Sequence, residues 1–150
     1  MNRLLIATLL TLSLGGCHSI FGPTEEHELD DAWDHWHSLG ITDYRYEVIR
    51  SCYCGGPAVG APVVVVVHDD QVIAAWYADT GEPLPQSALA HLPTIDDLFL
   101  IVDDALRTGA HELDVAYDEA YGFPRLIDID YDVHAVDDEL NVRSNDLRPF

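Results

Sequence analysis

The feature that most limits the fold of this chain is a short apolar segment at its N-terminus. Leu4 to Leu14 form an unbroken run of apolar, serine and threonine residues, and Arg3 precedes it. A helix needs roughly 20 apolar residues to cross a hydrocarbon core of about 30 Å, so this run is too short to span a membrane. A positive residue, a short apolar run and then small residues are the pattern of a cleaved signal peptide. The sequence therefore predicts that residues 1–16 are a signal peptide and contribute nothing to the mature fold.

The residues that close this segment carry a second signal. Leu14-Gly15-Gly16-Cys17 resembles the lipobox of bacterial lipoproteins, in which the cysteine receives diacylglycerol. The resemblance implies cleavage before Cys17, acylation of Cys17 with fatty acids such as palmitate, and firm membrane attachment through several acyl chains. An ordinary signal peptide or a buried strand is the alternative. His18 stands where an aspartate would indicate inner-membrane retention, so we expect the periplasmic face of the outer membrane if the source has two membranes.

The composition limits the partners of the mature chain. Cleavage after residue 16 removes one arginine and no acid, so the formal charge changes from −20 to −21 in a chain without lysine. Nucleic acid is excluded as a partner because phosphate binding needs a basic face. We expect residues 17–24 to be a lipid-anchored tether and residues 25–150 to be a single globular domain. The expected partners are the membrane, through the lipid, and a protein of the cell envelope.

The first half of the domain has the pattern of one helix followed by three strands. Thr24 is a candidate helix cap, and apolar residues recur after it at helical spacing. Alternating apolar and polar residues predict a strand over residues 43–52, and a valine run predicts another over 63–67. Asp69-Asp70 occupies the position of a tight hairpin turn before a third strand over 71–77.

The second half repeats this order. Thr94 and Asp97 have the spacing of a capping box, and the apolar stripe after them predicts a helix that ends at Gly109. Three further strands are predicted, over residues 112–117, 125–132 and 139–143.

Helix–strand–strand–strand, twice, favours the α+β class over an alternating β–α fold. We expect an antiparallel sheet of about six strands with two helices packed on one face. A tandem α-β-β-β arrangement is compatible with this order. The core should form where helices meet sheet, and its predicted members are Trp33, Trp36, Leu98, Phe99 and Val102 against Tyr46, Val65, Val115 and Ile129.

An ordered set of short motifs runs through most of the domain. Its members are Trp33, Tyr44, Tyr46, Arg50-x-Cys52-x-Cys54-Gly55, Gly81-Glu82, Pro93-Thr94, Leu98-Phe99, Tyr117-Asp118, Tyr121-Gly122-Phe123-Pro124, Asp128-x-Asp130 and Asp137-Asp138-Glu139. The set resembles a family of small exported bacterial proteins, frequent among lipoproteins and classed as a domain of unknown function. The resemblance covers roughly Trp33 to Leu147 and implies export and a compact domain. It brings no activity, substrate or catalytic residue.

Cys52 and Cys54 are the most informative pair outside the export segment. Residues i and i+2 of a strand point to the same face, so the two sulfurs are neighbours. Exported proteins occupy oxidising compartments, and Gly55-Gly56 would let the end of the strand curl until the sulfurs meet. A local disulfide is the first expectation. Free or metal-binding thiols and a redox-active pair are the alternatives.

Two groups of side chains have the spacing of metal ligands. His27, Asp31 and His35 repeat every four residues on the first predicted helix, a spacing that places imidazole and carboxylate groups on one face. The second group, Asp128, Asp130 and Asp132, alternates along a predicted strand and would present carboxylates that suit a hard cation such as calcium. The solvated helix face and the solvated strand face are the favoured interpretations of both groups.

No complete set of catalytic residues is recognisable in the sequence. It contains no Gly-x-Ser-x-Gly elbow, no His-Glu-x-x-His, no phosphate loop and no dinucleotide fingerprint. We therefore expect no cofactor and a non-enzymatic binding or envelope-assembly module. The alternative is a thiol-redox or metal-handling envelope protein that uses Cys52 and Cys54.

Overall fold

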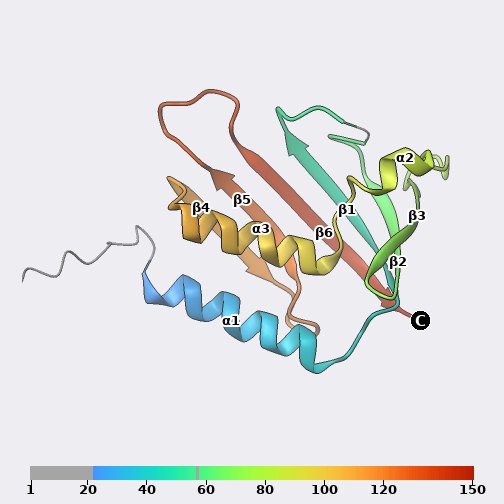
Figure 1. Cartoon of the computed structure of the whole chain (residues 1–150), viewed down its shortest axis with the longest axis horizontal. Coiled ribbons are helices and arrows are strands. Elements are labelled where there is room, and N and C mark those ends of the chain that lie inside the picture. The colour runs from blue at the N-terminus through green and yellow to red at the C-terminus, as the bar shows by residue number, and fades with distance from the viewer. Residues whose placement is uncertain (1–21, 57) are drawn as a thin grey trace, which may run out of the picture.

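The computed structural model of the chain describes residues 22–56 and 58–150. The predicted signal peptide, Cys17 and most of the predicted tether lie outside these described residues. Within them, the structure has three helices and six strands (Figure 1). The elements are α1 Pro23–Ser38, β1 Tyr44–Cys52, β2 Val63–His68, β3 Gln71–Tyr77, α2 Gln86–Leu89, α3 Ile95–Thr108, β4 Glu112–Tyr117, β5 Pro124–Asp130 and β6 Leu140–Pro149.

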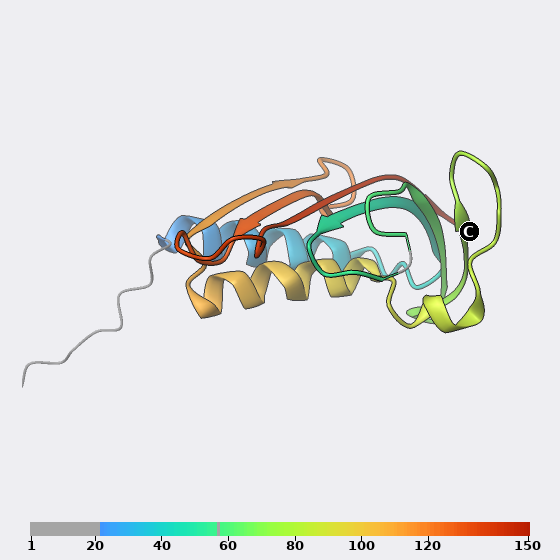
Figure 2. The same cartoon turned by 90° about the horizontal axis from the view of Figure 1, so that it is seen from above.

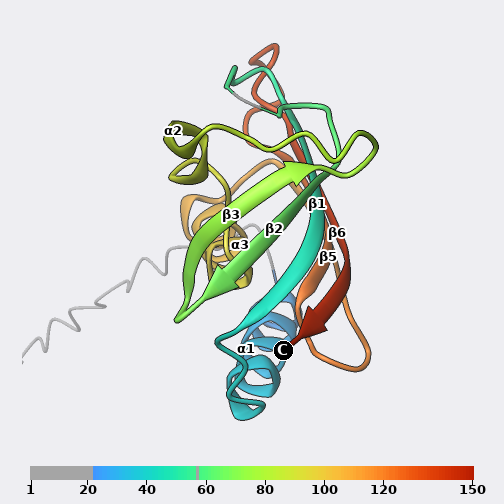
Figure 3. The ribbon, with the colours of Figure 1, turned by 90° about the vertical axis from the view of Figure 1, so that its right-hand side faces the viewer.

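The six strands form one antiparallel sheet, as the sequence predicts. Their order is β3-β2-β1-β6-β5-β4, and Figure 3 shows the sheet from β3 through β2, β1 and β6 to β5. Each half of the chain contributes a three-stranded meander, and the first strand of one meander pairs with the last strand of the other. This pairing runs from Tyr44 opposite Pro149 to Cys52 opposite Leu140. The two meanders are therefore joined into one sheet by the central pair of strands, β1 and β6, which are far apart in sequence.

Alternation along β1 separates the two faces of the sheet. Tyr44, Tyr46 and Val48 are buried, whereas Arg45 between them is exposed. The buried residues lie opposite alternate valines of β2, with Tyr46 directly opposite Val65. Successive side chains of a strand point to opposite faces, so one face of β1 and β2 belongs to the core.

Helix α3 begins and ends where the sequence signals place its ends. The Thr94 side chain accepts a hydrogen bond from the Asp97 amide at 3.1 Å, and the Asp97 carboxylate accepts one from the Thr94 amide at 2.8 Å. This reciprocal capping box satisfies two amides that the first helical turn leaves without partners. Gly109 ends the helix in the left-handed conformation (φ 71°), which glycine adopts without steric cost. Leu98, Phe99 and Val102 of its apolar stripe are buried, as predicted.

Helix α1 differs from its prediction at its start and in one tryptophan. The helix begins at Pro23 with Gly22 as its N-cap, so Thr24 lies inside the first turn and is not the cap. Proline is well suited to the first helical position because its missing N–H would have no partner there. Trp36 is buried as predicted, but Trp33 is half-buried, as is Val115 of the predicted core. In Figure 2, α1 and α3 run alongside each other.

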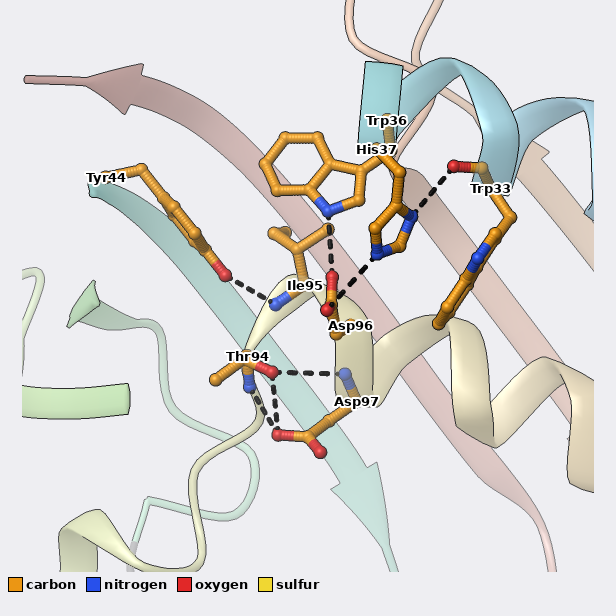
Figure 4. A network of polar contacts seen from close by, with 8 residues as sticks. All are labelled: Trp33, Trp36, His37, Tyr44, Thr94, Ile95, Asp96 and Asp97. Atoms are coloured by element: carbon orange, nitrogen blue, oxygen red, sulfur yellow. Dashed lines mark hydrogen bonds and ion pairs between the residues drawn. The ribbon is translucent and has the colours of Figure 1, made fainter. Parts of the chain in front are cut away.

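A polar network joins the start of α3 to α1 and β1 (Figure 4). The Trp36 indole N–H donates to the Asp96 carboxylate at 2.8 Å, and the Ile95 amide donates to the Tyr44 hydroxyl at 2.9 Å. His37 lies 3.5 Å from the other oxygen of Asp96. These bonds satisfy the polar ends of buried aromatic side chains, which would otherwise be costly to desolvate.

One helix and the bounds of two strands differ from the prediction. Helix α2 lies in a segment without a helical pattern, and it has a single turn. Strand β6 continues to Pro149, past the predicted end at residue 143, and β5 covers 124–130 instead of 125–132. A bulge in the β1–β6 pairing and a positive φ at Asp146 (52°) interrupt the alternation of apolar and polar residues in β6. The sequence pattern therefore does not show where this strand ends.

The turn between β2 and β3 contains an aspartate, Asp70, whose charge affects the stability of the fold. Asp69 and Asp70 have φ angles of 48° and 58°, the left-handed pair that a two-residue hairpin turn requires. Partial desolvation raises the pKa of Asp70, and the carboxylates of Asp96 and Asp69 raise it further. A raised pKa in the folded state means that ionisation of Asp70 destabilises the fold as pH rises through the carboxyl range.

We expect Asp70→Asn to stabilise the protein at neutral pH and to have no charge-related effect below the ordinary pKa of aspartate. The gain should be small, about 0.5 kcal/mol or less, because Asp70 is exposed. Urea unfolding at pH 7 and at pH 3 measures it. Asp79→Asn, in the loop after β3, is the control, and an equal gain from both variants at pH 7 would contradict the assignment.

Candidate functional site

A groove opens where the end of β1 faces α3 and the loop before it. Its volume is about 900 Å³, within the range of ligand sites in proteins. The lining comes from four parts of the chain, namely the last residues of β1 with the loop after it, the α2–α3 connection, the outer side of α3 and Tyr131 just after β5. No single motif contains the site, because the fold assembles it from distant segments.

Arg50 supplies the positive charge of this groove. It follows Tyr44, Tyr46 and Val48 at two-residue spacing, so its side chain leaves β1 on the core side of the sheet. The guanidinium donates to the backbone carbonyl of His91 at 3.4 Å. The Arg50 carbonyl accepts from the Gly60 amide at 2.8 Å, which fixes the backbone beside it. Arg50 is the only arginine among the lining residues of a chain that has no lysine.

The carboxylates of the groove are engaged elsewhere. Asp97 belongs to the capping box of α3, and Asp104 forms an ion pair with Arg107 one turn further along the helix. Among the described residues, Arg50 takes part in no ion pair. Its guanidinium therefore keeps donor capacity for a ligand, and a guanidinium binds carboxylates through two parallel hydrogen bonds.

Apolar and phenolic groups complete the lining. Leu100 of α3 is 55 % exposed although it belongs to a well-packed helix. Burial raises the pKa of Tyr131, and the Asp104 carboxylate raises it further, so the phenol remains neutral and can donate a hydrogen bond at physiological pH. A cation, a hydrogen-bond donor and an apolar rim together suit an amphiphilic ligand.

A disulfide between Cys52 and Cys54 stands at the end of the groove. The two Cα atoms are 5.1 Å apart, inside the range that disulfides span. Cys54 and Tyr53 are exposed, and Tyr53 retains 80 % of its accessible surface. Beyond the disulfide lies a smaller hollow of about 310 Å³, bordered by Arg50, Tyr131 and the acidic residues Asp137, Asp138 and Glu139.

Comparison with known protein families matches residues 28–149 to a family of unknown function, DUF6174. The chain belongs to DUF6174. This confirms the predicted resemblance to a domain of unknown function. No curated protein matches the chain, and no solved structure does. Within residues 22–56 and 58–150, no helix of this DUF6174 chain is both long and apolar enough to span a bilayer.

The structure spreads the first predicted metal ligands of this DUF6174 domain over exposed surface. His27, Asp31 and His35 are all exposed on α1. In the described part of the chain they do not form a group whose ligand atoms lie within 4.8 Å of one another.

The second predicted set of metal ligands is divided by the end of its strand. Asp128 and Asp130 lie on β5, whereas Asp132 lies beyond its end, where its carboxylate accepts from the His134 amide at 2.9 Å. The residues that the structure describes show no grouping of these three carboxylates within 4.8 Å. Asp132 thus stabilises a turn.

Another group, which sequence reasoning missed, does bring three potential ligands together. Asp43, His68 and Asp69 have ligand atoms within 4.8 Å of one another. The His68 imidazole hydrogen-bonds to the Asp43 carboxylate, and the Asp69 amide donates to the same oxygen at 3.3 Å. Asp43 and the hairpin are 25 residues apart, so only the β1–β2 pairing reveals the group. These residues could hold a divalent cation, but their mutual hydrogen bonds equally explain the arrangement.

We expect Cys52 and Cys54 to be oxidised in protein taken directly from cells. Alkylation under non-reducing conditions followed by mass spectrometry should find both thiols unmodified by the reagent. The ring closed by the bond is very small, so Cys52→Ser with Cys54→Ser should cost about 1–2 kcal/mol or less. Two alkylated cysteines in untreated protein would contradict the disulfide and favour the metal-binding or redox interpretation.

Proposed function

We propose that this chain is an exported, lipid-anchored bacterial protein whose domain binds a ligand or envelope partner without catalysing a reaction. The groove beside Arg50 is the proposed binding site. One observation carries the proposal: Arg50, a half-buried residue free of ion pairs among the described residues, lies in an open groove with an exposed apolar rim. The lipobox-like sequence before Cys17 supports the anchored location.

The chemistry of the groove favours a carboxylate on an otherwise apolar ligand, such as the C-terminus of a peptide. Arg50 would bind the carboxylate, and the exposed Leu100 would contact the apolar part. The two acids that line the groove, Asp97 and Asp104, would repel a polyanion. A single carboxylate held directly by Arg50 avoids most of this repulsion.

We also infer that α1 and α3 cover the same face of the sheet, as the sequence predicts. Trp33 of α1 contacts Phe99 of α3 with ring centres 5.1 Å apart, and Trp36 contacts Tyr44 of β1 at 5.5 Å. Arg50 leaves β1 on the same side as Tyr44. This packing would give the groove a rigid wall, which favours a preformed binding site.

A second candidate function follows from the disulfide at the end of the groove. Because Cys54 is exposed, a thiolate of a bound dithiol protein could attack the disulfide, form a mixed disulfide and then release a reduced Cys52 and Cys54 pair. The partner would leave with its own disulfide, so the two electrons pass from partner to this chain. Arg50, in the same groove, would help to bind this partner. It would take no part in the chemistry of thiol exchange.

Site-specific photo-crosslinking in the envelope tests the proposed site. A photoreactive residue in place of Leu100 should form adducts, and Arg50→Gln should reduce them by about tenfold because a hydrogen bond to a charged group is lost. The control position is Ile73 on β3, which is 51 % exposed and outside the groove.

The matched control variant is Arg125→Gln, which removes an exposed arginine of β5 that neither lines the groove nor pairs with one of its carboxylates. It should leave the adducts from position 100 unchanged. Absence of adducts at position 100, or equal adducts with Arg50→Gln, would overturn the groove as the binding site. Adducts that persist in Arg50→Gln but require both cysteines would favour thiol exchange instead.

A further inference from the structure

Asp43, His68 and Asp69, here called the hairpin cluster, lie at the end of the sheet away from the groove. Asp43 immediately precedes β1, and the first residue of β1 pairs with the end of β2, which leads into His68 and Asp69. Arg50 and the groove lie toward the other end of β1, and the cluster shares no residue with the groove. A ligand of the hairpin cluster would therefore be independent of the proposed groove.

The two nitrogens of the His68 ring face two different carboxylates. Nδ1 hydrogen-bonds to the Asp43 carboxylate, and an ionised carboxylate can only accept, so Nδ1 carries the proton. In the neutral ring, Nε2 then has a lone pair and no proton. Asp69 Oδ2 lies 3.7 Å from this Nε2. The hydrogen bonds of the cluster thus account for Asp43, whereas on the Asp69 side one acceptor faces another.

A positive charge between Nε2 and Oδ2 would satisfy both atoms. Protonation of the ring would supply one, but the two side chains are 56 % and 84 % exposed, and an ion pair in such a position gains little. A metal ion would bind both atoms directly. Zinc binds nitrogen and oxygen ligands at about 2.0–2.2 Å, which sets two ligands roughly 3.4 Å apart at a tetrahedral angle. A small movement of either exposed side chain gives that separation.

Further acids surround the hairpin cluster. Partial burial raises the pKa of Asp70, as do the carboxylates of Asp96, Asp69 and Asp43, whereas the imidazole of His37 lowers it. In the part of the chain that the structure describes, no arginine forms an ion pair with any of these four acids. The surroundings therefore favour a cation over an anion at the cluster.

We propose that His68 Nε2 and the Asp69 carboxylate bind a divalent transition-metal ion such as zinc, while Asp43 orients the His68 ring. A histidine that ligates a metal almost always donates its other ring N–H to a carboxylate or carbonyl, and Asp43 accepts in that way. The imidazole selects zinc, copper or nickel over calcium and magnesium, which prefer oxygen ligands. Two protein ligands leave the remaining positions of the ion to water or to a donor atom of another molecule.

Zinc titration of the full-length protein, purified in detergent through a tag without histidine, tests this site. Physiological salt screens the general attraction of cations to the acidic surface. Under these conditions the wild type should bind one zinc ion in a saturable step and should bind calcium far more weakly. His68→Gln and Asp69→Asn should each weaken zinc binding about tenfold or more, since each removes a ligand. Asp43→Ala should weaken it about tenfold, because the ring loses its orienting carboxylate.

The matched control is His27→Gln with His35→Gln, which removes two exposed histidines of α1 and should leave the affinity for zinc unchanged. Nitrogen NMR of the imidazole rings gives a test that needs no variant: zinc should shift the His68 Nε2 signal and leave Nδ1 protonated. Circular dichroism identifies any variant that fails to fold. Absence of a saturable zinc site in the wild type would overturn the proposal. So would unchanged binding by folded His68→Gln, coordination through Nδ1, or equal affinity for calcium.

Discussion

Replacing Gly122 with alanine should lower the free energy of unfolding by about 2–4 kcal/mol, the sum of a conformational and a steric cost. Gly122 has φ +80°, a conformation that costs an L-residue about 1–2 kcal/mol. A Cβ at this position would lie 2.8 Å from the Ala32 carbonyl oxygen and 3.3 Å from the His35 Cβ. The first contact is with the backbone of α1, which cannot rotate away as a flexible side chain would.

The turn around Gly122 has no alternative way to relax. Its amide donates to the Asp118 carbonyl at 2.9 Å, and the Asp118 amide donates to the Phe123 carbonyl at 2.8 Å. The Asp118 carboxylate accepts from the Ala120 and Tyr121 amides, both at 2.9 Å. Phe123 is buried in the core. Withdrawal of the turn from α1 would therefore break these bonds or expose Phe123.

Urea unfolding measures the Gly122→Ala effect as a lower midpoint at an unchanged slope. Gly81→Ala is the matched control, because Gly81 has φ +70° but no atom within 4 Å of an added Cβ. The control should lose only the conformational part, about 1 kcal/mol. Equal losses from the two variants would show that the contact between the turn and α1 contributes nothing to stability.

The parts of the fold that sequence reasoning predicted have local causes. The capping box of Thr94 and Asp97 and the left-handed Gly109 place α3 almost residue by residue. The alternation of β1 and the valine run of β2 predict their buried faces. These signals depend on residues a few positions apart, which a sequence displays directly.

Features that depend on distant residues were not predictable in this way. The start of α1 is set by Gly22 and Pro23, although Thr24 has the better side chain for a cap. The full length of β6 depends on pairing with β1, nearly 100 residues earlier in the chain. The burial of Trp33 depends on how α1 packs against α3, and the residues next to Trp33 in the sequence do not reveal that packing.

The candidate site shows the same division. Sequence reasoning singled out Cys52, Cys54 and, through the family resemblance, Arg50. The groove itself also needs the loop before α3, Leu100 and Tyr131, which no local pattern connects to Arg50. The only available signal was the rarity of permanent positive charge, since Arg50 is one of seven arginines in a chain with 27 acids and no lysine.

Cys17→Ala should abolish membrane attachment, the largest functional change that we expect from one substitution. Leu14-Gly15-Gly16 before Cys17 has the form of a lipobox, so the thiol of Cys17 is the proposed acceptor of diacylglycerol. Alanine has no thiol, so no thioether forms and no acyl chain is added. Loss of several acyl chains removes essentially all membrane affinity, since each buried CH₂ contributes about 0.8 kcal/mol.

Growth with labelled palmitate, followed by detergent phase separation, measures this effect. The wild type should carry label and enter the detergent phase, whereas Cys17→Ala should carry none and either leave that phase or persist as an uncleaved precursor. Cys52→Ser with Cys54→Ser is the control and should remain labelled, because only Cys17 follows the lipobox-like residues. A Cys17→Ala protein that is cleaved, labelled and still in the detergent phase would contradict lipidation at this cysteine. In that case the groove beside Arg50 would still be the proposed binding site, but the protein would reach its location without a lipid on Cys17.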